Sequence, residues 1–393
     1  MNGTIYMPVG EVCSSISDTY REKKNMVTLI NTSDVLEGRV LNHERVPNSN
    51  LKGQFKKTFQ RDDILYSEIR PQNRRFAYVD FSPIDYIAST KLMVIRAKKD
   101  VVSPKYLYYF LKNSSTVAEL QLLAETRSGT FPQITFSEVA NLTIPVPSLA
   151  VQEVIVQTMQ CLEDKITCNE QINDNLEQQA QSYFQELFVD NADPEWAIGT
   201  ISDLGTVVGG STPSKAKPEY YTESGIAWIT PKDLSNNKSK FVSHGENDIT
   251  ELGLRNSSAS IMPEGTVLFS SRAPIGYIAI AAGEVTTNQG FKSVVPKPEI
   301  GTPFVYFFLK NTLPVIEGMA SGSTFKEVSG STMKNVPAVI PDAETLAKFS
   351  DFCAPIFAQQ RILEEQNQSL ATLRDNLVPK LMSGEIDVTD IQL

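Results

Sequence analysis

Few residues of this chain have the type and spacing that catalysis requires. Its 393 residues include only two histidines, far apart in sequence, and four cysteines without a CxxC pair. A zinc site or a Ser-His-Asp or Cys-His centre is therefore not predicted. The segment REKK (21–24), with Asp18 upstream, fits the acidic-x-Lys spacing of metal-dependent nucleases, although so short a charged pattern also arises by chance. No GxxxxGK[ST] is present, and VVGGST (207–212) is a lone glycine pair, so we expect that the chain lacks the parts of an enzyme.

Charge is distributed unevenly along the chain. The net charge is −10, but residues 1–147 carry 19 Lys and Arg against 15 Asp and Glu, whereas residues 148–199 carry 1 against 10. The acid is thus concentrated in particular segments, and the remainder is neutral to mildly basic. This distribution leaves a polyanionic partner possible. No apolar run reaches the roughly 18 residues that a membrane span needs, and the N-terminus has no apolar signal region, so we expect a cytoplasmic protein without a membrane partner.

One phrase occurs twice, half a chain apart. YLYYFLKN (106–113) and FVYFFLKN (304–311) are identical at five of eight positions. At an offset of 194, Asn141 then corresponds to Asn335 and Pro147 to Pro341, and the match continues without a gap into two polar helical segments. Upstream, DDILYSEIRP (62–71) corresponds more loosely to EGTVLFSSRAP (264–274). The chain is therefore a duplicated unit of about 195 residues.

Each copy is predicted to contain an α/β (α+β) domain followed by a long helix. Short β-rich runs such as DILYSEI, KLMVIRAK, TVLFSSR and YIAIAAG predict mixed or mostly antiparallel strands, and Pro104 and Pro303 predict the start of the repeated helix. The boundaries that we predict are 1–147 and 191–341 for the two domains, and 148–190 and 342–393 for the central and C-terminal helices.

The two helices carry an apolar stripe with 4-3 spacing, which is typical of a coiled coil. The alternative is a pair of long surface helices with a solvated acidic face. Asn173 and Asn367 interrupt the stripe at equivalent positions, where a buried Asn fixes register and orientation. The residues of the predicted seam are Leu162, Ile166, Asn173, Leu176, Ile356, Leu363, Asn367, Leu370 and Leu377.

Five segments of the chain form a specific pattern together with this arrangement: GGSTPSKAKPEYYTESGIAWITPKDL (209–234), LFSSRAPIGYIAI (268–280), TNQGF (287–291), ASGSTFKEV (320–328) and LRDNLVPKLMSGEIDV (373–388). With these segments, the whole arrangement resembles the specificity (S) subunit of type I restriction-modification systems. The first half matches the pattern more loosely, because it lacks the GGSTPS turn.

The resemblance implies a fold and a role. Two homologous target recognition domains would be joined by two long antiparallel coiled-coil spacer helices with pseudo-two-fold symmetry. Each domain would recognise one half of a bipartite, asymmetric sequence in double-stranded DNA. The helices and adjacent surfaces would bind two methyltransferase (M) subunits, and two restriction-translocation (R) subunits would complete the enzyme. This chain would be non-catalytic and without a cofactor of its own, since S-adenosylmethionine, ATP and Mg²⁺ would belong to those partners.

Under this resemblance, polar loops of the second domain supply the candidate DNA contacts. Asn288 or Gln289 would pair with adenine and Arg272 with guanine, and glycines 209, 210 and 290 would let the backbone approach a phosphate. The alternative is that SSR and TNQG are structural turns whose side chains cap neighbouring strands. The candidates are Ser211, Thr212, Lys215, Thr230, Lys232, Ser271, Arg272, Asn288 and Gln289.

The first domain offers a corresponding set, with basic segments for phosphate contact and ordinary solvated loops as the alternative. The turns SGT (128–130) and GST (322–324) would contact DNA or orient the following helix. The candidates are Lys56, Lys57, Ser67, Arg70, Arg74, Arg75, Ser89, Thr90 and Lys91.

Two other functions are compatible with the sequence. One is a non-catalytic protein-interaction scaffold whose helices dimerise, and the other is an autonomous metal-dependent nuclease. A scaffold would lack salt-dependent, sequence-selective DNA binding, and a nuclease would cleave DNA by itself.

Overall fold

The repeated phrases form helices with proline in the first turn, as predicted. YLYYFLKN lies in α2 (Pro104–Lys112) up to its last residue, Asn113, which caps the helix, and FVYFFLKN lies in α9 (Thr302–Met319). Proline is favourable in the first helical turn because the missing N–H has no partner there and φ is already helical. The aromatic faces are buried: Tyr106 and Phe307 are 0 % exposed. The repeat therefore marks an equivalent core position in each half.

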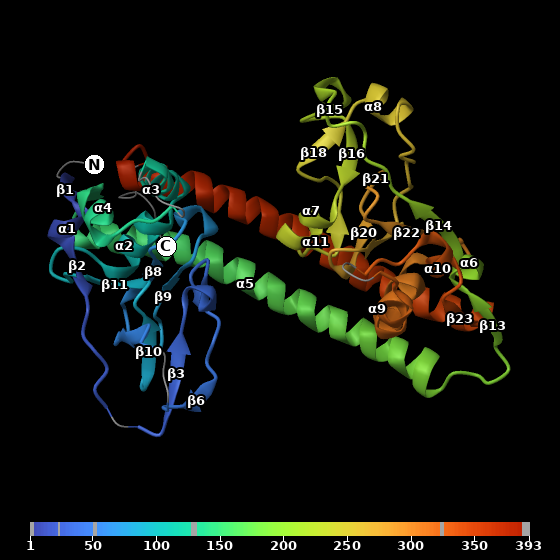
Figure 1. Ribbon diagram of the computed structural model, residues 1–393, viewed down its shortest axis with the longest axis horizontal. Coiled ribbons are helices and arrows are strands. Elements are labelled where there is room, and N and C mark those ends of the chain that lie inside the picture. The colour runs from blue at the N-terminus through green and yellow to red at the C-terminus, as the bar shows by residue number, and fades with distance from the viewer. Residues whose placement is uncertain (1–3, 23, 50–52, 127–131, 323–325, 387–393) are drawn as a thin grey trace. The chain divides into compact units, whose positions relative to one another are not determined.

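The computed structural model describes residues 4–22, 24–49, 53–126, 132–322 and 326–386. Contacts divide the chain into two compact units, drawn in Figure 1. Unit 1 is Met1–Ile166 with Gln368–Leu393, and unit 2 is Thr167–Asn367. Each unit therefore contains one copy of the α/β domain and a portion of both long helices.

Unit 1 contains two four-stranded sheets with mainly antiparallel pairing. The first has the order β2 (Cys13–Ile16), β11 (Leu92–Ala97), β8 (Ile64–Ser67), β9 (Phe76–Tyr78), and the second β6 (Arg45–Pro47), β3 (Met26–Ile30), β10 (Tyr86–Ser89), β7 (Phe55–Lys57). Smaller ladders are β1 (Ile5–Pro8) with β12 (Thr143–Val146) and β4 (Val35–Leu36) with β5 (Arg39–Val40). Its short helices are α1 (Val9–Val12), α3 (Ser114–Thr126) and α4 (Phe136–Asn141).

Unit 2 is built around a five-stranded and a four-stranded sheet. Their orders are β14 (Gly205–Gly209), β22 (Lys292–Pro296), β19 (Val267–Ser271), β20 (Ile275–Ala281), β17 (Phe241–Val242), and β15 (Tyr221–Thr222), β18 (Asn247–Ile249), β16 (Ile226–Ile229), β21 (Thr286–Thr287). A ladder joins β13 (Ala197–Thr200) to β23 (Pro337–Ile340). The short helices are α6 (Ile201–Leu204), α7 (Pro231–Asn236), α8 (Glu251–Arg255) and α10 (Gly330–Lys334). In Figure 1, β15, β16, β18 and α8 lie together at one end of this unit, away from α9 and α10.

The predicted strands are present. DILYSEI contains β8, KLMVIRAK contains β11 and TVLFSSR contains β19, whereas YIAIAAG contains the last five residues of β20. Pairing is mostly antiparallel, with parallel exceptions such as β10 with β3 and β17 with β20. The prediction of mixed, mostly antiparallel domains is therefore confirmed.

The two long helices are α5 (Leu149–Gln185) and α11 (Ala343–Ser383). Within unit 2 they pack antiparallel: Asn169 Nδ2 donates to Asn367 Oδ1 (2.8 Å), whereas Tyr183, further along α5, lies against Phe349 and Phe352 near the start of α11. Within unit 1, Val156 and Met159 of α5 share a core with Val378 and Leu381 of α11. Over the described residues, neither these nor any other helix is long and apolar enough to span a membrane.

Candidate nucleic-acid interface

The four candidate loops of unit 2 meet at one place. Ser211 N–H donates to Thr287 O (2.9 Å), and Ser271 N–H donates to Gly290 O (2.7 Å). The Thr212 hydroxyl hydrogen-bonds Gln289 Oε1. The loop after β16 joins them, because a Cβ on Gly290 would lie 2.9 Å from Pro231 Cγ. We call residues 209–212, 230–232, 271–274 and 287–292 the loop cluster.

Two glycines allow the loops of the cluster to pack closely against one another, so the space beside them is filled by protein atoms and not open to a phosphate. A Cβ on Gly210 would lie 2.0 Å from Asn288 O and 2.4 Å from Thr287 O, distances that no real Cβ occupies. Gly290 is similarly crowded by Pro231. Only Gly209 has open space, with Lys292 Cδ at 4.0 Å. The expectation that all three glycines admit a phosphate is therefore corrected for Gly210 and Gly290.

Several candidate side chains in the loop cluster have structural partners. Ser271 is 0 % exposed, and its hydroxyl donates to Gly290 O (3.1 Å). Asn288 Oδ1 accepts from Gly290 N–H (2.8 Å), and Thr230 caps α7 together with Asp233. Ser271 and Asn288 thus make the contacts of the structural-turn alternative, Thr230 caps a helix, and Ser271 is not available to a surface ligand in this structure.

Exposed groups remain at the edge of the loop cluster. Lys215, Lys232 and Gln289 are exposed, whereas Ser211 and Thr212 are half-buried. Lys232 Nζ lies 2.6 Å from Glu246 Oε2, but both side chains are more than 60 % exposed, so solvent screens the pair strongly. These side chains are accessible to a phosphate or a base edge.

Arg272 belongs to a group of three charges. Its Nη1 lies 3.5 Å from Glu327 Oε2, and Lys292 Nζ lies 3.7 Å from Glu327 Oε1. Burial lowers the pKa of Lys292, against the opposing effect of Glu327. Sequence reasoning selected Arg272 but missed Lys292 and Glu327, which lie 20 and 55 residues further along the chain. The only signal in the sequence was that Glu327 lies in ASGSTFKEV (320–328), one of the segments that carry the family resemblance.

In unit 1, two of the candidate serines are internal. Ser67 and Ser89 are each 2 % exposed. The Ser67 hydroxyl accepts from Ile69 N–H (3.1 Å), and the Ser89 hydroxyl accepts from Lys91 N–H (3.3 Å). These hydroxyls therefore stabilise turns at the strand ends. Thr90 is half-buried and its N–H donates to Gln54 O (2.7 Å), while Lys91 is exposed near Glu68 (3.5 Å).

The basic segments of unit 1 separate into internal and exposed cations. Lys57 Nζ donates to Leu92 O (2.7 Å), and burial lowers its pKa. Arg74 donates to the Ser114 hydroxyl (2.8 Å), and Arg75 donates to Ser33 O (3.0 Å). Lys56 and Arg70 are exposed. The turn 128–130 and residues 323 and 324 of the turn 322–324 lie outside the described residues.

The predicted seam residues lie on the inner face of the helices. None of the nine is exposed. Leu176 and Ile356 pack in the core of unit 2, and Leu162 and Leu377 pack against the core of unit 1. The stripe therefore forms a partly buried face, with Ile356 and Leu363 buried, unlike the solvated helices of the alternative.

Unit 2 is joined to its helices by a buried charge network. Lys240 Nζ, with a side chain 6 % exposed, lies 2.7 Å from Glu177 Oε2 on α5 and 2.8 Å from Gln360 Oε1 on α11. Lys310 of the repeated phrase contacts the same carboxylate, 2.5 Å away. Burial lowers the pKa of Lys240 to about 8, opposed by Glu177. Sequence reasoning missed this network.

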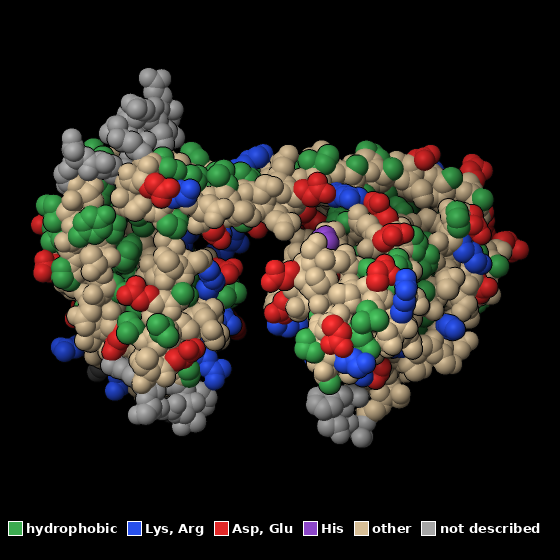
Figure 2. Space-filling view, turned by 90° about the horizontal axis from the view of Figure 1, so that it is seen from above, with side chains coloured by type: hydrophobic (Ala, Val, Ile, Leu, Met, Phe, Trp, Pro, Cys, Tyr) green, Lys and Arg blue, Asp and Glu red, His purple; other side chains and the backbone are tan. Residues whose placement is uncertain are grey.

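Charges of both signs lie close together on the surface. On the face shown in Figure 2, Lys and Arg side chains neighbour Asp and Glu, with uncharged atoms between them. Such a face attracts phosphates less than a continuous basic surface would. Local cations such as those of the loop cluster would therefore matter more for a polyanionic ligand.

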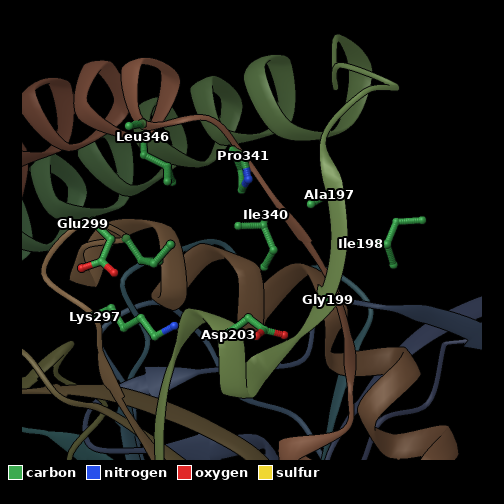
Figure 3. A pocket seen from close by; sticks show the side chains of 11 residues that line it. Ala197, Ile198, Gly199, Asp203, Lys297, Glu299, Ile340, Pro341 and Leu346 are labelled. Carbon is green, nitrogen blue, oxygen red and sulfur yellow. The ribbon is translucent and has the colours of Figure 1, made fainter.

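A cavity of about 440 Å³ lies beside the β13–β23 ladder of unit 2. In Figure 3, Lys297 points toward Asp203 from the opposite wall. Asp203 already accepts a hydrogen bond from Thr200 N–H (2.8 Å), which caps α6 and lowers the pKa of the carboxyl. The residues that line the cavity include no hydroxyl, thiol or imidazole side chain. Across the described residues, no group of three or more His, Cys, Asp or Glu is arranged to hold a metal ion.

Comparison with known proteins connects this geometry to a family. The family model described as "Type I restriction modification DNA specificity domain" matches residues 6–178 and again residues 194–372, once in each repeat. The chain is 29 % identical to the Type I restriction enzyme HindI specificity subunit of Haemophilus influenzae, over 92 % of this chain and 94 % of that protein. It is 39 % identical to the MjaIX specificity subunit of Methanocaldococcus jannaschii, over 47 % of this chain and 45 % of that protein.

A solved structure has a similar fold. The S subunit of the type I restriction-modification system from M. genitalium aligns with a TM-score of 0.55 at 17 % identity, covering 97 % of each chain. At this identity the likeness concerns the fold alone. It supports the two-domain architecture of an S subunit.

Proposed function

The chain belongs to the type I restriction modification DNA specificity family, and from this premise we propose how its residues perform that role. Its function is sequence-specific DNA recognition within a type I restriction-modification enzyme, and specificity subunits of this family are not catalytic in themselves. The observation that carries the assignment is the double match of the family model, one per repeat. Each repeat would recognise one half of a bipartite target.

The side chains that would contact DNA are the accessible ones. In unit 2, Arg272 and Gln289 have the donors and acceptors that pair with base edges, and Lys215 and Lys232 would contact phosphates. In unit 1, Lys56, Arg70 and Lys91 would take these roles. The exposure of these groups supports the proposal, and the burial of Ser67, Ser89 and Ser271 makes them supports of the loops.

The long helices would act as an antiparallel coiled-coil spacer. A helix of 37 residues such as α5 is about 55 Å long at about 1.5 Å per residue. Its buried stripe and the Asn169–Asn367 hydrogen bond support pairing in a fixed register. We infer that this pairing sets the number of base pairs between the half-sites.

The partners would be two methyltransferase subunits and two restriction-translocation subunits. Apolar side chains on the outer faces of the helices support binding of partner proteins there, since Ile172 is 39 % and Ile362 is 47 % exposed. S-adenosylmethionine, ATP and Mg²⁺ would bind to those partners. The assembled enzyme would act in the cytoplasm.

A DNA-binding measurement tests the proposal. The chain is combined with its methyltransferase subunit, and affinity is measured for genomic fragments at several salt concentrations. We expect sequence-selective binding whose affinity falls steeply as salt rises, because phosphate contacts release counterions.

Two other results would identify the alternatives. Absence of salt-dependent, selective binding in the presence and absence of the methyltransferase subunit would favour the protein-interaction scaffold. Cleavage of DNA by the isolated chain with Mg²⁺ or Mn²⁺ would favour the nuclease.

A further inference from the structure

Glu327 is held rigidly at the edge of the loop cluster. Its N–H donates to Ser321 O (2.8 Å), and Ser321 N–H donates back to Glu327 O (3.1 Å). The next residue, Val328, donates its N–H to Ser271 O (2.9 Å), and Glu327 forms an antiparallel bridge with Arg272. The backbone of Glu327 is therefore fixed, and its carboxylate lies beside two cations.

The charge balance at this position is distinctive. Glu327 lies 3.5 Å from Arg272 and 3.7 Å from Lys292, so one carboxylate offsets part of two positive charges. The Arg272 and Glu327 side chains are 37 % and 39 % exposed. An ion pair with this exposure is weak, and a DNA group can displace it.

Unit 1 has the same backbone arrangement with different charges. Gln133 occupies the position equivalent to Glu327, with an antiparallel bridge to Ile69, and Ile134 N–H donates to Glu68 O (2.9 Å) as Val328 does to Ser271. The residue opposite is thus Arg272 in unit 2 and Ile69 in unit 1. The acid and the arginine occur together in one unit and are both replaced by uncharged residues in the other. Because the acid occurs only where the arginine occurs, we infer that Glu327 interacts with Arg272 and is not needed merely for the backbone arrangement that both units share.

We propose that Glu327 is a specificity-determining residue that positions Arg272 and limits the attraction of Arg272 and Lys292 for DNA phosphates. In free protein and on non-target DNA, the carboxylate keeps Arg272 engaged. On the target half-site, Arg272 exchanges this weak partner for a base edge, where two donors fit N7 and O6 of guanine. Glu327 thereby lowers non-specific affinity more than specific affinity. The inference rests on the proposed function, because it assigns a role within DNA recognition.

The test measures specific and non-specific binding by the chain assembled with its methyltransferase subunit. The probes are a duplex containing the target, identified by methylome sequencing, and a scrambled duplex of equal length. For Glu327→Gln we expect tighter non-specific binding and a salt-dependence slope steeper by about 0.9, equivalent to one further phosphate contact. The ratio of specific to non-specific affinity should fall about tenfold, within the range of one bidentate base contact.

Three variants provide controls. Glu327→Asp keeps the charge and should keep the wild-type slope. Glu264→Gln removes the same charge from a residue that precedes the opposite end of β19, where Glu264 pairs with Arg361 (2.6 Å), and should leave the ratio unchanged. Gln133→Glu introduces a negative charge into unit 1, where Gln133 Oε1 lies 3.4 Å from Lys91 Nζ. This variant should make the salt dependence of DNA binding shallower.

The outcomes separate the inference from the function. If wild-type protein prefers its target but Glu327→Gln has the same slope and ratio, the role of Glu327 is wrong while DNA recognition stands. If the wild-type complex itself shows no preference, the proposed function fails. If Glu327→Gln does not fold, an unchanged slope in Gln133→Glu overturns the inference independently.

Discussion

Arg272 is the residue on which base recognition by unit 2 depends most in this account. It follows strand β19, it is held by a bridge to Glu327, and its guanidinium is partly exposed beside the Glu327 carboxylate, which Lys292 also approaches. Glu327 orients the Arg272 guanidinium, but the pair is partly exposed, so the carboxylate does not offset the positive charge completely. Orientation before binding reduces the entropy that ordering a long side chain costs.

We expect Arg272→Ala to weaken specific binding by about 1–3 kcal/mol and to relax one position of one half-site. Lys348→Ala, which removes an exposed cation from α11 of the same unit, is the matched control and should change the methylated sequence at no position. Methylome sequencing of cells that carry each variant with the methyltransferase subunit makes the comparison. An unchanged pattern with Arg272→Ala would remove Arg272 from the interface.

Lys240 gives unit 2 a defined dependence on pH. Its folded-state pKa of about 8 is below the ordinary 10.5 because burial disfavours the charge. Between these values the unfolded chain binds the proton and the folded chain does not, so stability rises with pH from about 8 to 10.5. We expect the free energy of unfolding of wild type minus that of Lys240→Met to rise by roughly 2–3 kcal/mol across this window, at 1.36 kcal/mol per pKa unit.

Urea unfolding at a series of pH values checks this difference. Lys310→Met, which removes the other cation beside Glu177, is the control and should retain the rise. Parallel curves for wild type and Lys240→Met would show that Lys240 has an ordinary pKa.

At the residue scale, the sequence identified polar residues that are exposed, such as Lys215 and Gln289, but it did not show that other candidates, such as Ser67 and Ser271, are buried. ILYS in β8 and VLFSS in β19 end in short polar residues, which suggests the start of a loop, yet every residue of both strands is buried. The alternation of apolar and polar residues does not show whether a polar residue at the end of a strand is exposed in a loop or buried because both faces of the strand are covered. Glu327, Lys292 and Lys240 escaped notice because their partners come from distant segments.

At the scale of elements, the two copies of the repeated helix differ after the shared LKN. In unit 1, Asn113 leaves the helical conformation (ψ 138°) and its side chain accepts from Ser115 N–H (3.2 Å), so a new helix, α3, begins. In unit 2, α9 continues to Met319 although Pro314 lies inside it. The sequence predicted where both helices begin, and the residues after the repeat decide where they end.

The paired helices lead to a prediction about spacing. One heptad inserted after Asn173 in α5 and one at the facing position of α11 would lengthen the pair by about 10.5 Å, at about 1.5 Å per residue. We expect the gap between half-sites to grow by about three base pairs, at about 3.4 Å each, with both half-site sequences unchanged. Methylome sequencing again gives the motif.

A matched insertion of three residues serves as the control, because it turns the apolar stripe away from the seam and should prevent assembly. A spacer of unaltered length in the heptad variant would contradict the role of the helices as a spacer.

At the scale of the whole molecule, the chain folds into units that do not follow the order of the sequence. Residues 368–393 belong to unit 1, and Val378, Leu381 and Met382 are buried in its core with the repeated helix. Duplication and helical periodicity predicted two α/β domains and two long helices. They did not predict that α11 completes the core of unit 1, because a periodic stripe specifies a buried face but not its partner.

The central claim is that this chain recognises a bipartite DNA sequence, with one repeat for each half. The most direct measurement is single-molecule methylome sequencing of a host that lacks other DNA methylation and expresses this chain with its adenine methyltransferase subunit. We predict one methylated motif with two specified parts, separated by a fixed number of unspecified base pairs, and no such motif without this chain. Methylation that does not depend on this chain, or a single uninterrupted motif, would contradict it.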